Sequence, residues 1–115
     1  MTELLRRHVE NFNAGVRTGD WESMLEQFDD AAELEFHGIP VGPFSGKGAI
    51  AAAYRDQPPD DELRVLEHRE QGDGIEARYA WLAEPEVAAG EMLITVDAGR
   101  IKRLVVTFDR GVEWS

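Results

Sequence analysis

The sequence predicts a single α+β domain spanning residues 1–115, with helices first and a sheet after them. Apolar residues recur at helical spacing near the N-terminus, whereas four later runs alternate apolar and polar residues. The chain has 115 residues, which is enough for one hydrophobic core and too few for two domains. The predicted order, αα-β-α-ββββ, is typical of the α+β class.

The first helix is expected over residues 2–18. Four apolar residues share one helical face through spacings of four, three and four: Leu5, Val9, Phe12 and Val16. Gly15 weakens this helix by roughly 0.5–1 kcal/mol, so its presence indicates close packing. Gly19 suits the left-handed position that follows a helix end.

A second helix is expected to begin at Asp20, whose side chain suits the N-cap. Its apolar stripe consists of Trp21, Leu25 and Phe28, with Met24 beside it. The pair Asp29-Asp30 ends this helix.

The first strand is expected over residues 32–37, where apolar and polar residues alternate. This alternation favours Leu34 and Phe36 on the inner face and Glu35 on the outer face. A slip of one residue would exchange the two faces, so the register decides which side chain enters the interior.

The third helix is expected over residues 46–55, with Ser45 as its cap and with Ile50 and Tyr54 on its buried face. Residues 58–61, Pro-Pro-Asp-Asp, form a stop signal. Four strands follow, over residues 63–70, 75–82, 91–97 and 101–108. Gly and Asp residues predict tight hairpins at 71–74 and 97–100.

Composition excludes several classes of function. Lys and Arg total 12 and Asp and Glu total 23, which gives a formal charge of −11. Such an acidic chain repels phosphate backbones, so neither nucleic acid nor an anionic membrane is expected as a partner. The absence of Cys excludes disulfides and thiolate chemistry, and no His pair has metal-site spacing. No metal or cofactor is expected, and the lack of a leader or a membrane-spanning segment predicts a cytoplasmic protein.

The late strands predict an apolar wall facing a small-molecule site. Their inward residues are Ile75, Ala77, Tyr79, Trp81, Met92, Ile94, Val96, Leu104, Val106 and Phe108. An apolar cleft with a few polar groups is the usual form of a ligand site, and Tyr54, Tyr79 and Trp81 could supply those groups. The alternative is that these aromatic side chains simply fill the core.

The opposite face of the same strands carries several apolar residues where solvent would favour charge. These are Leu82, Leu93, Thr95, Ile101, Val105 and Thr107. An exposed apolar face of this kind marks an interface, so we expect a homodimer through it.

Four short segments together resemble the nuclear transport factor 2-like superfamily, in its ketosteroid isomerase and SnoaL-like branch. The matching segments are residues 17–21 (RTGDW), 28–31 (FDDA), 44–50 (FSGKGAI) and 99–104 (GRIKRL). The resemblance implies a conical fold, in which a curved mixed or antiparallel sheet wraps a pocket that helices close, and it implies that dimers are common. It does not fix a function, because members include isomerases, cyclases, hydrolases, dehydratases and binding modules.

The residues of the family's isomerases carry over only in part. The resemblance places the tyrosine donor at Phe12 and the protonated acid at Met92, and neither can donate a hydrogen bond. The base falls at Glu35 in one register and at Phe36 in the other. Tyr54 matches a helix tyrosine that braces the donor in some family isomerases.

Three functions therefore remain open. The first is an isomerase- or cyclase-type enzyme acting on a small apolar metabolite, with Glu35 or His37 as base and Tyr54 or Tyr79 as donor. The second is a binding domain for an apolar ligand, and the third is a protein-interaction module. The predicted ligand contacts are Phe12, Phe36, Tyr54, Tyr79, Trp81, Met92 and Phe108.

Overall fold

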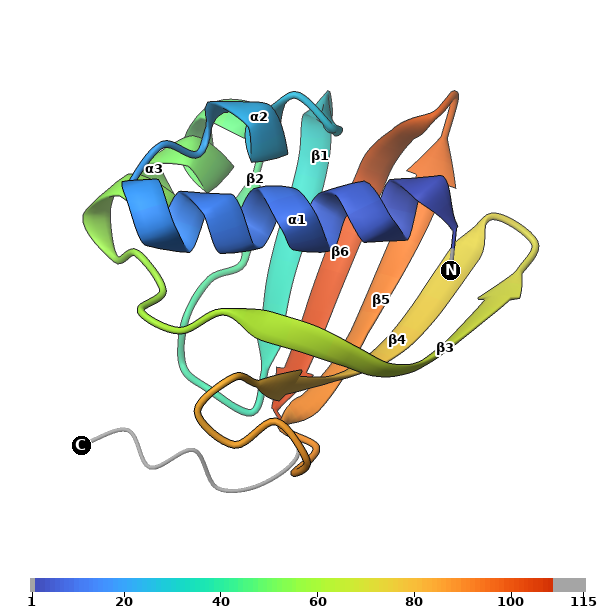
Figure 1. The fold of residues 1–115 in the computed structure, drawn as a ribbon. Helices are drawn as coiled ribbons and strands as arrows, with labels where there is room; N and C mark the ends of the chain where they lie inside the picture. The colour runs from blue at the N-terminus through green and yellow to red at the C-terminus, as the bar shows by residue number, and fades with distance from the viewer. Residues whose placement is uncertain (1, 109–115) are drawn as a thin grey trace.

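Three helices and a six-stranded mixed sheet make up the part of the chain, residues 2–108, that the computed structural model describes (Figure 1). The helices are α1 (Glu3–Thr18), α2 (Glu22–Leu25) and α3 (Lys47–Asp56). The strands are β1 (Phe28–His37), β2 (Phe44–Ser45), β3 (Leu63–Gln71), β4 (Gly74–Trp81), β5 (Gly90–Asp97) and β6 (Arg100–Phe108). The predicted α+β class and element order are thus confirmed, with β2 as an unpredicted addition.

The sheet is curved, and the helices lie against its inner side. The strand order is β2-β1-β6-β5-β4-β3, in which β1 and β6 are parallel and all other neighbours are antiparallel. Figure 1 shows α1 crossing the strands while α2 and α3 lie together near one end of β1. This arrangement leaves the far end of the sheet without a helix over it.

The cap of α1 forms as the sequence predicts, whereas Trp21 and not Asp20 occupies the N-cap of α2. Gly19 adopts a left-handed conformation (φ 80°), and its N–H donates to the Gly15 carbonyl at 2.8 Å. Asp20 Oδ1 accepts from the Glu22 N–H at 3.0 Å, so it satisfies a free amide in the first turn of α2. Ser45 does not cap α3, because it lies in β2 and pairs with Glu33 of β1. Gly46 occupies the N-cap position instead.

Gly15 lets α1 and Trp21 approach closely. A Cβ built at Gly15 would lie 2.2 Å from Cε3 of Trp21, far inside van der Waals contact. Trp21 in turn stacks obliquely on Tyr54, with ring centroids 4.9 Å apart. The glycine therefore allows one aromatic ring to connect the first and third helices.

The predicted second helix is too long. Phe28 lies in β1 rather than on the apolar stripe of α2, and it pairs with Ile101 of the parallel strand β6. The Ile101 N–H donates to the Gln27 carbonyl at 2.8 Å, which draws the chain into the sheet directly after α2. Pairing with a strand more than 70 residues away overrides the local helical spacing.

Ile101 faces the interior, which corrects its predicted place on the outer face. Val96 pairs with Ile101 while Thr95 pairs with Arg103, so Lys102 is an extra residue in β6. This bulge exposes both Lys102 and Arg103 and returns Leu104 to the buried side. Leu82 is exposed, as predicted, but lies just beyond the end of β4.

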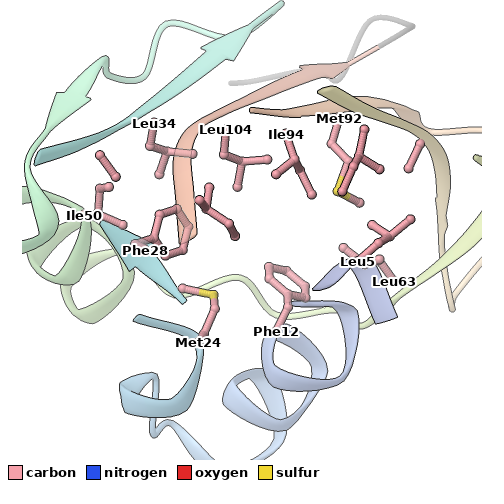
Figure 2. Close-up of a cluster of buried hydrophobic side chains, with 14 of the residues drawn as sticks. Leu5, Phe12, Met24, Phe28, Leu34, Ile50, Leu63, Met92, Ile94 and Leu104 are labelled. Atoms are coloured by element: carbon pink, nitrogen blue, oxygen red, sulfur yellow. The ribbon is translucent and has the colours of Figure 1, made fainter. Parts of the chain in front are cut away.

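The hydrophobic core lies between the inner face of the sheet and α1. Figure 2 shows side chains of Leu34, Leu104, Ile94 and Met92 projecting from the strands towards Phe12 on α1. Alternate residues of the strands supply this face, as period-two alternation predicts. The core fills only part of the space enclosed by the curved sheet, and the remainder is a cavity.

Candidate functional site

The enclosed space is a cavity of about 790 Å³ (hereafter the cavity), bounded by the inner sheet face, α1, α3 and two loops. All seven residues that the sequence places in contact with a ligand line it: Phe12, Phe36, Tyr54, Tyr79, Trp81, Met92 and Phe108. Residues 39–41 and 57–61 also line the cavity, and because several of them are exposed we take this side as its mouth.

The register of β1 places Phe36 in the cavity and Glu35 on the opposite face. Phe36 stacks on Phe108 at a centroid distance of 6.3 Å. Glu35 Oε2 accepts from Arg103 Nη2 at 2.6 Å, and this hydrogen bond lowers the pKa of the carboxyl. An ionised, paired carboxylate outside the cavity cannot reach a ligand held inside it.

His37 also lies outside the cavity. Its Nε2 is 3.5 Å from Glu35 Oε2, and both residues border a separate hollow of about 300 Å³ beside residues 39–43. The structure therefore brings Glu35 and His37 together with Arg103, but it separates this group from Tyr54. Two of the four residues predicted to act as acid or base, Glu35 and His37, are not part of the cavity wall.

Both predicted donors, Tyr54 and Tyr79, line the cavity. Tyr54 projects from α3, is 6 % exposed, and has its ring packed against Trp21. Burial raises the pKa of its phenol, so the hydroxyl stays protonated at neutral pH and can donate a hydrogen bond.

Tyr79 and Trp81 extend the aromatic wall along β4. Their rings meet edge to face at a centroid distance of 5.4 Å. A Cβ built at Gly90 would lie 3.0 Å from the Tyr79 hydroxyl and 1.8 Å from the Thr107 carbonyl oxygen. Gly90 is thus required where β5 passes close to both neighbours.

His8 is a cavity residue that the sequence analysis missed. It lies on α1, is 2 % exposed, and packs edge to face on Phe28. Burial lowers its pKa to about 4, so the imidazole is neutral at physiological pH. The sequence indicated this position through helical spacing. His8 follows Leu5 by three residues and precedes Phe12 by four, so it lies on the same buried face of the helix.

Gln27, a neighbour of His8, belongs to a partly buried hydrogen-bond network. Gln27 Nε2 donates to the Leu4 carbonyl at 3.4 Å, and its Oε1 accepts from Asn11 Nδ2 at 3.2 Å. The Gln27 side chain opposes the effect of burial on the pKa of His8. Among residues 2–108, Nδ1 of His8 is buried without a hydrogen-bond partner.

The mouth carries negative charge and no positive charge. Asp60 and Asp61 border it, whereas no Lys or Arg of the described residues lines the cavity. Asp61 Oδ2 also accepts from the Ala83 N–H at 3.2 Å, which joins the two loops on this side. The site is therefore poorly suited to an anionic ligand.

Residues 2–108 contain no group of three His, Asp or Glu side chains arranged to hold a metal ion. None of their helices is both long and apolar enough to cross a membrane.

Comparison with known proteins identifies relatives at the level of the family and the fold. The model of the SnoaL-like domain matches residues 6–104. No curated protein matches the sequence.

Many solved structures share the fold at low sequence identity. An NTF2-like protein of unknown function from Cytophaga hutchinsonii has a TM-score of 0.72 and 16 % identity, over 93 % of this chain and 88 % of that chain. A candidate ketosteroid isomerase from Kribbella flavida has a TM-score of 0.70 and 15 % identity, over 97 % and 79 %. A candidate polyketide cyclase from Pseudomonas putida has a TM-score of 0.66 and 17 % identity, over 94 % and 90 %. At such identities the likeness shows the fold alone.

Proposed function

The chain belongs to the SnoaL-like domain family, and from that premise we propose that it binds a small apolar molecule in the cavity. One observation carries the proposal: the curved sheet and the helices enclose about 790 Å³ that the side chains of the described residues leave unfilled. Ligand sites for small molecules have volumes of about 300–1,000 Å³ and mainly apolar walls. The unfilled cavity supports ligand binding over an interaction module, which a filled cone would favour.

The wall of the cavity argues against the ketosteroid isomerase mechanism. That reaction needs donors for the developing enolate oxygen, yet the two matching positions present the side chains of Phe12 and Met92. The remaining candidate base, Glu35, lies on the other face of β1. A site that only binds a ligand needs no donor at Phe12 or Met92 and no base at Glu35.

A second candidate function is acid–base catalysis by a different pair of residues. His8 and Tyr54 line the same cavity, one as a neutral imidazole and the other as a protonated phenol. An imidazole with a pKa near 4 is a weak base at neutral pH, which limits the rate that it could support. This candidate predicts slow conversion of a β,γ-unsaturated ketone to its conjugated isomer, with activity lost in His8→Phe and in Tyr54→Phe.

A thermal-shift screen tests binding directly. Neutral, rigid hydrophobes of one to four rings are added to the purified protein, and the unfolding midpoint is measured. A ligand at one hundred times its Kd stabilises the folded state by about 2.7 kcal/mol, which raises the midpoint by several degrees in a domain of this size. If no compound of any size raised the midpoint, the proposed function would be wrong.

A further inference from the structure

The polar side chains that line the cavity gather in one stretch, the last turn of α3 and the loop after it. This stretch contributes Tyr54, Gln57, Asp60 and Asp61 to the lining. The strands contribute only apolar and aromatic side chains, and the hydroxyl of Tyr79 among them has almost no accessible surface. A polar group of a ligand therefore finds partners on the side formed by residues 54–61.

Tyr54 gives this side an unpaired hydroxyl. The residue is 6 % exposed and lines the cavity, and its hydroxyl forms no hydrogen bond within residues 2–108. It is not among the polar atoms that the protein seals completely, so the cavity reaches it. Buried polar groups are nearly always paired, and an accessible one without a partner indicates that a ligand supplies the partner.

Asp60 and Asp61 place two carboxylates at the mouth, on the same stretch. Asp60 is exposed and has no partner among the described residues, and Asp61 accepts only the N–H of Ala83. No Lys or Arg of the described residues lines the cavity beside them.

The acidic neighbours of this pair are neutralised by basic residues. Asp56 pairs with Arg55 at 3.1 Å, and Glu62 pairs with Arg17. Asp60 and Asp61 are therefore the acidic residues of this region that lack a basic partner within residues 2–108, and they are also the ones that line the cavity.

Uncompensated carboxylates at the entrance of an aromatic cavity favour a cationic group on the ligand. A protonated amine forms charge-assisted hydrogen bonds with carboxylates, and aromatic faces such as those of Phe36 and Trp81 attract cations further. The formal charge of −11 on the whole chain adds a long-range attraction for cations. Residues 2–108 hold no group of three His, Asp or Glu side chains that could bind a metal ion, so an organic ammonium fits this mouth better.

We propose that the ligand is an amphiphilic amine, whose apolar body occupies the cavity and whose ammonium group lies at the mouth against Asp60 and Asp61. This inference rests on the proposed binding function and names its ligand class.

The test uses one biphenyl body with three different ends: 4-(aminomethyl)biphenyl as cation, 4-hydroxybiphenyl as neutral probe and biphenyl-4-carboxylate as anion. Titrated against the wild-type protein at about 0.02 M salt, the amine is expected to bind about fivefold more tightly than the neutral probe, and the anion most weakly. In about 0.5 M salt the preference for the amine should shrink to about twofold or less, because salt screens exposed charges.

The double variant Asp60→Asn/Asp61→Asn removes the two charges and keeps the side-chain shape, including an oxygen that can accept from Ala83. Its preference for the amine should vanish, while its affinity for the neutral probe should stay unchanged. Asp73→Asn is the control, because it removes a charge from the hairpin at the opposite end of the nine-residue strand β3, about 30 Å away. This variant should keep the preference.

The outcomes separate this inference from the proposed function. Equal affinity for the amine and the neutral probe, tighter binding of the carboxylate, or an amine preference that survives in the double variant would overturn the inference while leaving binding intact. An equal loss of preference in Asp73→Asn would overturn it too, since the net charge and not the mouth would then select the ligand. An amine affinity that does not change with salt in the wild type would contradict it without any variant. Failure of every probe to bind would overturn both proposals.

Discussion

His8 links the stability of this fold to pH. Its pKa is about 4 when folded and near 6.5 when the chain is unfolded, because burial disfavours the charged ring and its neighbours Gln27 and Phe28 are neutral. Between these values the unfolded chain binds more protons, so stability falls as the pH falls. From pH 7 to pH 5 this one residue should lower the free energy of unfolding by about 2 kcal/mol.

Urea denaturation at both pH values checks this effect, with His8→Phe as the reference. The variant keeps a ring of similar volume and cannot titrate. Its loss of stability between pH 7 and pH 5 should therefore be about 2 kcal/mol smaller than that of the wild type. The carboxylates contribute to both proteins and cancel in the difference. An identical loss in both proteins would mean that His8 is not buried as a neutral ring.

Gly15 and Gly48 make a matched pair for testing helix packing. Gly15→Ala would place a methyl group 2.2 Å from a Trp21 ring carbon, so it should destabilise the protein by about 1–3 kcal/mol despite the better helix propensity of Ala. A Cβ at Gly48 in α3 meets no atom within 4 Å, so Gly48→Ala should stabilise by up to about 1 kcal/mol. The denaturation midpoint should fall in Gly15→Ala and rise in Gly48→Ala, relative to the wild type. Stabilisation of both variants would refute the Gly15–Trp21 contact.

At the residue scale, the sequence predicts which way a side chain faces where apolar and polar residues alternate along a strand. It fails where a polar residue type, such as histidine, is buried. Phe36 and Glu35 take the faces that period-two alternation favours. His8 was missed because a histidine is rarely counted as a core residue, although its helical position is buried. Its neighbour Gln27 is distant in sequence, and no local pattern connects the two residues.

At the scale of one element, the two faces of β1 should have separate functional effects. Glu35→Gln and His37→Ala change the outer face only, so neither should alter ligand affinity by more than about twofold, a difference under 0.5 kcal/mol. Phe36→Ala removes a ring that contacts Phe44 and Phe108 in the cavity, so it should weaken binding at least tenfold. Titration with 4-hydroxybiphenyl measures all three. Loss of affinity in Glu35→Gln would show that the register of β1 is wrong.

The same scale shows where local sequence patterns cease to be informative. The late hairpins follow Gly and Asp signals, and their strand bounds agree with prediction within one residue. The start of β1 at Phe28 and the bulge at Lys102 depend on pairing between β1, β5 and β6. Because these partners lie far apart in the sequence, neither feature leaves a local pattern.

At the scale of the whole molecule, a homodimer through the outer sheet face stays a prediction. Leu93 is 42 % exposed there and pairs in register with Val105, while the ion pairs Arg78–Glu91 and Arg103–Glu35 flank them. Sedimentation of the wild type is expected to show a dimer, and Leu93→Glu should give a monomer because it would bury a charge. A monomeric wild type would exclude this interface.

A cavity-filling variant shows whether the curved sheet and the helices leave space that a ligand can occupy. Ala53 on α3 lines the cavity, whereas its neighbour Ala52 does not. Equilibrium titration with 4-hydroxybiphenyl is therefore compared among the wild type, Ala53→Trp and Ala52→Trp. We predict saturable one-to-one binding by the wild type and by Ala52→Trp, and loss of binding in Ala53→Trp. Equal binding by both tryptophan variants would show that the ligand lies outside the cavity and that the proposed site is wrong.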